Sequence, residues 1–375
     1  VMKEFAWDEI PESELRKIVA ETIAFEIPLK KVTENISVLE LFHGPTLAFK
    51  DVGARFMSRC LGYFLKNETR KVTVLVATSG DTGGAVANGF YDVEGIEVVI
   101  LYPKNRVSPV QEKQLTALGK NIHALEVNGS FDDCQALVKQ AFSDESMNEE
   151  LLLTSANSIN VARWLPQQIY YVLALKQWLK IHSENPVICV PSGNFGNICA
   201  GILAHHRGLP VEHFIAACNV NDVVPEYLRT EILQPKETVA TISNAMDVGD
   251  PSNFVRILEL FDKEFNQVKS KLSGYTIDDE ETLKTIERVE KDYGYVLDPH
   301  GAVAFVALEK YLAENGGKGF FLETAHPVKF PDSVEKATGK SVEIPKSLEE
   351  LMKLEKFTTE INPQYEELKG FLLGK

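Results

Sequence analysis

Two segments of the sequence repeat one pattern of strand, glycine-rich turn and helix, and this pattern constrains the fold most. The first runs from the apolar stretch KVTVLVATSG, at residues 71–80, into DTGGAVANGFY. The second runs from PVICVPSGN into FGNICAGILAHH, over residues 186–206. Buried apolar strands that alternate with helices are typical of a parallel sheet covered by helices on both faces.

Further strands and helices extend each pattern into a series. Apolar runs predict strands at 97–103, 122–129 and 212–220, and periodicity predicts helices at 131–142, 279–293 and 301–314. We therefore predict an α/β fold with two open, twisted, mostly parallel sheets flanked by helices. The expected parts are an N-terminal helical segment (1–35), a smaller α/β domain (36–150), a larger α/β domain (151–345) and a C-terminal helical tail (346–375).

Composition limits the partners of the chain. The 375 residues include 39 basic and 54 acidic side chains, giving a net charge of −15. An acidic protein repels nucleic acid and anionic lipid, so we expect neither as a partner, whereas a local basic site can still hold an anionic small molecule. The five cysteines form no C-x-x-C pair, which favours a cytoplasmic protein over a secreted disulfide framework. No apolar stretch is long enough to predict a membrane span.

Both glycine-rich turns are candidate anion sites. Backbone N–H groups at a helix N-terminus favour a negative charge, and ligands of such sheets bind at the carboxyl ends of the strands. Neither turn matches the fingerprints for nucleoside triphosphates or dinucleotides. Asp81 in the first turn suggests contact with a hydroxyl as well as an anion, whereas the second turn lacks acidic residues and suits a phosphate. The alternative is that each turn is only a tight connection.

Lys50, in HGPTLAFKD, is the candidate nucleophile. We expect it on a strand, where a buried charge is costly and an imine with a carbonyl cofactor would remove that cost. The alternative is a lysine that pairs with Asp51 or reaches solvent. The segment Asn157–Arg163 carries hydrogen-bonding groups and an arginine suited to binding a phosphate or carboxylate. The alternative is that it contains only a helix N-cap and a surface arginine. The histidines lack metal-ligand spacing, so we expect no metal.

The motifs LFHGPTLAFKD, ATSGDTG, PSGNFGN and TAHPVKF occur in one order between Leu39 and Phe330. Together they resemble the threonine synthase family of fold-type II pyridoxal-phosphate (PLP) enzymes. The resemblance implies a tryptophan synthase β-like fold with PLP as cofactor, and Lys50 as its Schiff-base lysine. It implies that Asp81 and Thr324 face the cofactor hydroxyl and the pyridine nitrogen. The residues it implies around the cofactor phosphate are Gly193, Asn194, Phe195, Gly196 and Asn197.

The activity that this resemblance implies is conversion of O-phospho-L-homoserine and water into L-threonine and phosphate. Ser79 and Thr82 would bind the substrate carboxylate. Candidates for the substrate phosphate are Ser155, Asn160, Arg163, Lys329 and Arg55. The open alternatives are another fold-type II lyase, such as a serine or threonine dehydratase or a cysteine synthase, and a non-catalytic binder of phosphorylated ligands. We expect a monomer or homodimer. The resemblance also implies that chains of this family carry several dozen further residues before the part that corresponds to Val1.

Overall fold

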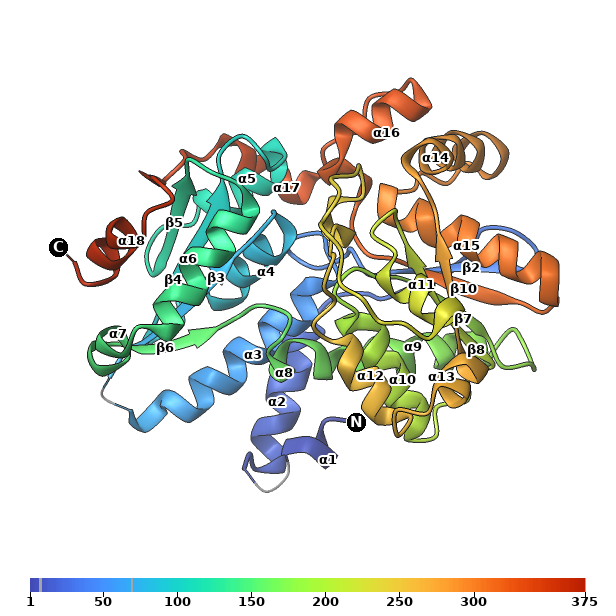
Figure 1. Cartoon of the computed structure of the whole chain (residues 1–375), viewed down its shortest axis with the longest axis horizontal. Helices are drawn as coiled ribbons and strands as arrows, with labels where there is room; N and C mark the ends of the chain where they lie inside the picture. The colour runs from blue at the N-terminus through green and yellow to red at the C-terminus, as the bar shows by residue number, and fades with distance from the viewer. Residues whose placement is uncertain (7–8, 69, 375) are drawn as a thin grey trace. The chain divides into compact units, whose positions relative to one another are not determined.

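The computed structural model describes residues 1–6, 9–68 and 70–374, and these residues divide into two compact units (Figure 1). Unit 1 consists of Val1, Phe25–Phe49 and Trp164–Glu343. Unit 2 consists of Met2–Ala24, Lys50–Arg163 and Ile344–Lys375. Each unit contains its own sheet, so each has its own hydrophobic core.

The described residues of unit 1 form a six-stranded sheet in the order β1-β2-β10-β7-β8-β9. The pair β1–β2 is antiparallel and the other neighbours are parallel. The strands are β1 (Leu29–Lys31), β2 (Ile36–Glu40), β7 (Val187–Pro191), β8 (His213–Cys218), β9 (Leu272–Thr276) and β10 (Gly319–Glu323).

Helices cover both faces of this sheet because successive strand residues point to opposite sides. On β10, Phe321 packs into the core formed with α14 and α15, whereas Phe320 meets Trp178 of α9. The helices of unit 1 are η2 (Leu165–Gln167), α9 (Gln168–Trp178), α10 (Gly196–His206), α11 (Val223–Thr230), η3 (Asn244–Met246), α12 (Phe254–Leu260), α13 (Phe265–Lys271), α14 (Asp279–Tyr293), α15 (Pro299–Asn315), η4 (Pro327–Lys329) and α16 (Pro331–Thr338).

The described residues of unit 2 form a five-stranded parallel sheet in the order β11-β5-β4-β3-β6. Along β3, Val74 and Val76 pack with residues of α3 and α4, and Leu75 and Ala77 pack with residues of α6 and α18. The strands are β3 (Val72–Ala77), β4 (Ile96–Pro103), β5 (Ile122–Val127), β6 (Leu152–Ser155) and β11 (Thr359–Ile361).

The helices of unit 2 lie on both sides of this sheet, with α3 and α4 on one face and α6 on the other (Figure 1). They are α1 (Lys3–Ala6), α2 (Glu12–Thr22), α3 (Lys50–Phe64), η1 (Leu65–Asn67), α4 (Asp81–Phe90), α5 (Pro109–Thr116), α6 (Phe131–Ser143), α7 (Glu145–Glu150), α8 (Val161–Trp164, whose last residue belongs to unit 1), α17 (Lys346–Lys353) and α18 (Tyr365–Leu372).

The division of the chain differs from the ranges expected from the sequence. Strand β2 pairs with β10, so residues 25–49 belong to unit 1, whereas we expected 1–35 as an N-terminal helical segment and 36–49 in the smaller domain. Residues 151–163 belong with 50–150 rather than with the larger domain, since β6 pairs with β3, and residues 344–375 join them because β11 adds a strand beside β5. The C-terminal segment is therefore not only helical. None of the helices within the described ranges has the combined length and hydropathy needed to cross a bilayer.

Candidate active site

The first glycine-rich turn, in unit 2, is held by the hydroxyl of Thr78. Its Oγ1 accepts hydrogen bonds from the backbone N–H groups of Gly80 at 2.9 Å and Gly83 at 2.8 Å. Gly80 has a φ of +136°, which side chains rarely allow, and it immediately precedes α4. A Cβ atom at Gly83 would stand 2.5 Å from Leu115 Cδ2. The turn therefore needs both glycines and presents the N-terminus of α4.

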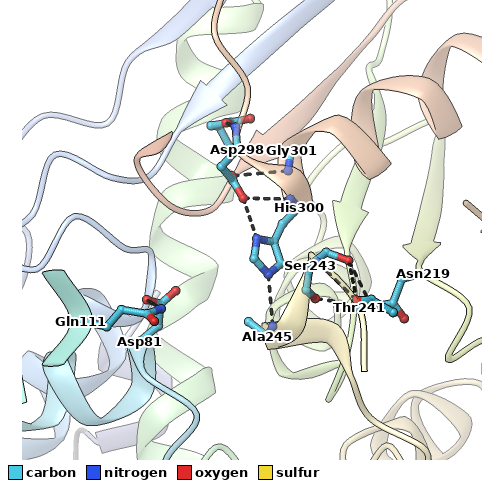
Figure 2. Close-up of polar contacts among 10 residues, drawn as sticks. Asp81, Gln111, Asn219, Thr241, Ser243, Ala245, Asp298, His300 and Gly301 are labelled. Atoms are coloured by element: carbon cyan, nitrogen blue, oxygen red, sulfur yellow. Dashed lines mark hydrogen bonds and ion pairs between the residues drawn. The ribbon is translucent and has the colours of Figure 1, made fainter. Parts of the chain in front are cut away.

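The polar side chains of this turn differ in accessibility. Ser79 and Thr82 are half-buried, whereas Asp81 is buried, at 5 % exposed. Gln111 Nε2 donates to Asp81 Oδ1 at 2.9 Å, and Figure 2 draws these two side chains next to each other. The same Gln111 closes the capping box of α5 with Ser108. The sequence shows the capping box but not the contact with Asp81, so Gln111 was missed as a residue that orients this carboxylate.

Lys50 is the first residue of α3, and the expectation of a strand at this position was wrong. Ala48 forms an isolated bridge to Ala325, and Phe49 lies in a turn directly before α3 begins at Lys50. Lys50 is half-buried, and the helix dipole disfavours a positive charge at the N-terminus of a helix. This position therefore suits a lysine that reacts as a neutral amine.

A second polar turn of unit 2 follows β6 and is tied to the end of β3. Asn157 Nδ2 donates to the carbonyl of Ala77 at 3.0 Å, and Asn160 Nδ2 donates to the carbonyl of Ser155 at 2.9 Å. Ser155 Oγ donates to Asn157 Oδ1 at 3.2 Å. These bonds place Ser155 and Asn160 in one structured turn beside the strand that leads into the first glycine-rich turn.

Arg163, at the end of that turn, is buried, at 3 % exposed. Its guanidinium donates to the carbonyl of Ala156. Burial lowers its pKa to about 10, and the nearby Asp51 carboxylate opposes this shift. Arg163 remains a cation at neutral pH, but its charge is directed to the protein interior. The surface position considered as the alternative for this residue is therefore wrong.

Arg55 makes a different contact. Its Nε and Nη2 atoms donate to the carbonyl of Glu21 at 3.1 and 2.6 Å, near the C-terminus of α2. Cationic donors stabilise the exposed carbonyls at the end of a helix. In this structure Arg55 therefore joins α3 to α2.

The second glycine-rich turn, in unit 1, links β7 to α10. Phe195 is the N-cap of α10 and has a left-handed backbone, with φ of +63°. Ser252 donates to Asn194 Oδ1 from both its N–H and its hydroxyl, each at 2.7 Å, and Asn253 Nδ2 donates to the carbonyl of Asn194 at 2.9 Å. The loop is thus held from outside by residues that precede α12, a tertiary contact for which the sequence offers no local signal.

The other end of the loop is fixed by Asn197. Its Nδ2 atom donates to the carbonyl of Pro191 at 2.9 Å, and the buried Tyr171 hydroxyl donates to the carbonyl of Asn197 at 2.8 Å. The pKa of Tyr171 is raised by burial, so its hydroxyl stays protonated and remains a donor. Residues 191–197 contain no acidic side chain. A fixed loop with helix N-terminal N–H groups and no carboxylate has the donor chemistry of a phosphate site.

Thr324 follows β10 and lies beside the segment that leads to Lys50. The N–H of Phe49 donates to the carbonyl of Thr324 at 2.9 Å, and Thr324 is 5 % exposed. Lys329 is fully buried and its Nζ donates to the carbonyl of Thr46 at 2.9 Å. Lys329 therefore holds the residues 46–49 segment in place. Burial and the nearby His43 lower the pKa of His326 to about 4, so this neighbouring ring is neutral at pH 7.

Comparisons with known proteins agree with this geometry. A family model described as "Pyridoxal-phosphate dependent enzyme" matches residues 23–320, and one described as "Threonine synthase, C-terminal" matches residues 301–372. A threonine synthase of Serratia marcescens is 47 % identical over 374 residues, which cover 100 % of this chain and 86 % of that protein.

Two solved structures extend the similarity to the fold. Threonine synthase from Escherichia coli matches with a TM-score of 0.91 and 45 % identity, over 100 % of this chain and 86 % of that one. PLP-bound threonine synthase from Brucella melitensis matches with a TM-score of 0.92 and 36 % identity, over 99 % of this chain and 86 % of that one.

The chain belongs to the family of pyridoxal-phosphate dependent enzymes. A lysine at the start of a helix, a phosphate-type loop and a neutral threonine hydroxyl fit that cofactor, which carries an aldehyde, a phosphate and a pyridine nitrogen. Within this family the chain is a member of the threonine synthases, which are lyases. The described residues contain no group of three or more His, Cys, Asp or Glu side chains placed to hold a metal ion.

Proposed function

We propose that this chain converts O-phospho-L-homoserine and water into L-threonine and inorganic phosphate, the last step of threonine biosynthesis. The observation that carries the proposal is the 47 % identity, over the whole chain, to a threonine synthase. The fold supports it, because the residues suited to a cofactor, a carboxylate and a phosphate all lie in the turns that follow strands or in the segments beside them.

We propose the following cofactor contacts. PLP, when bound, withdraws electrons from the substrate and makes its Cα and Cβ protons acidic. Lys50 Nζ would hold the cofactor and move the proton at the substrate Cα. The backbone N–H groups of residues 193–197 would bind the cofactor phosphate, and the Thr324 hydroxyl would bond to the pyridine nitrogen. Asp81, oriented by Gln111, would face the cofactor hydroxyl.

The substrate contacts follow from accessibility. Ser79 and Thr82 are half-buried hydroxyls at the N-terminus of α4, which favours an anion, so we assign them to the substrate carboxylate. Ser155 and Asn160 belong to one turn and would bind the substrate phosphate, with Arg163 supplying a positive charge behind them. Cationic and hydrogen-bonding groups stabilise the leaving phosphate as the Cγ–O bond breaks. Lys329 and Arg55 bind backbone carbonyls outside the turn at residues 155–163, so we assign them to positioning.

The test combines covalent trapping with a product assay. Borohydride reduction followed by mass spectrometry should place PLP on Lys50, and K50A should remove this adduct. Phosphate release from O-phospho-L-homoserine should then exceed keto-acid formation from serine or threonine. The opposite preference would assign a dehydratase, and a protein that never forms the adduct would be a binder without turnover.

The role of Arg163 has a matched control in Arg55. We expect R163K to raise the KM for O-phospho-L-homoserine, because a buried guanidinium is not replaced by an ammonium group. R55K should leave that KM unchanged, since Arg55 binds the end of α2. An unchanged KM in R163K would remove Arg163 from the substrate site.

We also propose that the chain acts in the cytoplasm on a small-molecule substrate, as a monomer or homodimer, without nucleic acid or membrane partners. The net charge of −15 supports the last point, because a negatively charged surface repels polyanions. Light scattering at several protein concentrations measures the oligomeric state.

A further inference from the structure

Unit 1 contains a buried cluster of titratable groups that the proposed reaction does not use. Its members are Glu323 and Asp298, both 0 % exposed, and His300, 2 % exposed. Glu323 ends β10, and Asp298 is the N-cap of α15. Buried charged groups are costly unless they are paired, so this cluster needs a structural explanation.

The hydrogen bonds of His300 fix its tautomer. The backbone N–H of Ala245 donates to His300 Nε2 at 3.2 Å, so this nitrogen is an acceptor and carries no proton. Nδ1 therefore carries the proton and donates to Asp298 Oδ1 at 2.5 Å. Figure 2 shows these two bonds in line, from Asp298 through the imidazole ring to Ala245. The neutral ring thus connects a carboxylate to one backbone amide.

On the side of Asp298, these hydrogen bonds continue to Glu323, the last residue of β10. The N–H of Asp298 donates to Glu323 Oε1 at 2.7 Å. Burial and the Asp298 carboxylate raise the pKa of Glu323 well above its ordinary value. Gly301 makes room for it, since a Cβ atom there would stand 1.7 Å from Glu323 Oε2. These contacts fix the side chain of Glu323, the residue that directly precedes Thr324.

On the side of Ala245, the bonded segment packs against the loop at residues 193–197. A Cβ atom at Gly193 would stand 2.9 Å from the backbone oxygen of Ala245 and 2.7 Å from Met246 Cα. The short helix η3 therefore packs directly against the first glycine of the loop. Its other side is fixed by Asp247, whose Oδ1 accepts from Thr241 Oγ1 at 2.7 Å and from Asn219 Nδ2 at 2.8 Å. At the N-terminal end of η3, Asn219 Nδ2 donates to the Oγ of the N-cap Ser243 at 3.1 Å, and His300 accepts from the next backbone amide but one, that of Ala245.

We infer that His300 is a positioning residue for the cofactor phosphate: by holding the Ala245 amide it sets where η3 presses on Gly193, and so sets the spacing of the loop N–H groups. This inference rests on the proposed role of residues 193–197. Glu323 and Asp298 fix the ring, so one set of bonds links the strand end before Thr324 to the phosphate loop.

Two amide variants separate the bonds of the ring. In H300Q the amide oxygen reaches the former Nε2 position and can accept from Ala245. In H300N the shorter side chain reaches only Asp298, so the bond to Ala245 is lost. One lost hydrogen bond predicts PLP affinity roughly 3- to 10-fold weaker in H300N than in wild type. H300Q should bind PLP within about twofold of wild type, since it keeps the acceptor.

His213 supplies the matched control. It is a buried histidine of the same unit, bonded to Ser273 Oγ at 2.8 Å and stacked on Tyr311. It pairs with Val187 at the start of β7, whereas Ser192 follows the end of that strand. H213N should therefore lower the melting temperature of the apo-protein without changing PLP affinity.

The experiment is titration of each apo-protein with PLP, followed by absorbance, with 31P NMR of the bound cofactor. H300N should weaken binding and shift the phosphorus resonance, whereas H300Q and H213N should match wild type in both. Equal losses in H300N and H300Q, or wild-type affinity in H300N, would overturn the inference. Borohydride labelling of Lys50 at saturating PLP tests the proposed function separately, because it should succeed in wild type and in all three variants.

Discussion

Gly53 lies where helix α3 comes closest to the chain around Arg163. A Cβ atom at Gly53 would stand 2.1 Å from the backbone oxygen of Arg163, far inside ordinary contact distance. Both residues are buried, and a close-packed interior leaves little room for either backbone to move. Because Lys50 begins the same helix, this contact also fixes the helix that carries the proposed cofactor lysine.

Two alanine substitutions in α3 test this contact. G53A should lower the free energy of unfolding by about 1–3 kcal/mol, the usual cost of overpacking a core. G62A adds the same methyl group to the same helix, where the nearest atom is Val93 Cγ1 at 3.4 Å. It should be neutral or raise stability by up to about 1 kcal/mol, since alanine favours helix more than glycine does. Urea unfolding measures both, and equal stabilities would show that Arg163 does not restrict Gly53.

Helix α18 packs its apolar side chains into the core of unit 2 and is also bonded to one carboxylate, that of Asp144. Asp144 Oδ2 accepts from the Tyr365 hydroxyl and from Lys369 Nζ, each at 2.7 Å. Together with a bond to Ser146, these contacts lower the pKa of Asp144 well below its ordinary value, with the bond to Lys369 contributing most. The polar part of the attachment of this C-terminal helix therefore depends on the ionised form of Asp144.

This dependence has a definite sign. A folded-state pKa below the unfolded value gives stabilisation that is present above the unfolded pKa, about 3.9 for aspartate, and that is lost as pH falls through the folded pKa. We expect D144N to melt at a lower temperature than wild type at pH 6, and the difference to shrink as pH falls below about 3.9. Y365F, which removes one of the bonds, should show a smaller difference. A gap between wild type and D144N that stays constant from pH 6 to 2.5 would contradict this account.

Local patterns predicted several single elements of the fold. The expected helix at 279–293 is α14, and the expected strands at 97–103 and 122–129 match β4 and β5 within a few residues. Their partners were less predictable, because pairing depends on contacts between distant residues. The register that sets Ile36 beside Gly319 moves β2 into unit 1, and no local period indicates it. Strand β11 was missed for the same reason.

The candidate site shows the same limit. The glycine-rich stretches around Gly80 and Gly193 identified both turns, because a cluster of glycines after an apolar strand is visible in the sequence itself. The positive φ of Gly80 is a local requirement, whereas the close approach of residues 245–246 to Gly193 is not. Gln111, Tyr171 and His300 were not identified, since each acts through one tertiary hydrogen bond to a turn or to the segment packed on it. Motifs therefore revealed the positions proposed to touch ligands but not the residues that hold them in place.

Each unit carries a separate core, and this has consequences for unfolding. The core of unit 1 is built around β2, β7, β8 and β10 with α14 and α15, and that of unit 2 around β3, β4 and β5 with helices on both faces. Proteins with more than one cooperative core often depart from two-state unfolding. Residues that report on one core alone are therefore needed to follow each unit.

The cysteines supply such reporters. Cys60 and Cys134 belong to unit 2, and Cys189, Cys199 and Cys218 belong to unit 1. Burial raises the pKa of every one of these thiols, to about 12 for Cys60, Cys134 and Cys199. Thiolate is the reactive form, so the native protein should react slowly with a thiol reagent at pH 8.

Pulsed labelling at increasing urea concentration, read by mass spectrometry of peptides, should show the thiols becoming reactive by unit. The three thiols of unit 1 should share one midpoint, and the two of unit 2 should share another, because each set lies in or beside one cooperative core. PLP should slow labelling of unit 1 if the loop at residues 193–197 binds its phosphate, since a ligand stabilises the folded state that binds it. Distinct midpoints for Cys189 and Cys218, which lie on the neighbouring strands β7 and β8, would refute the view that unit 1 unfolds as one body.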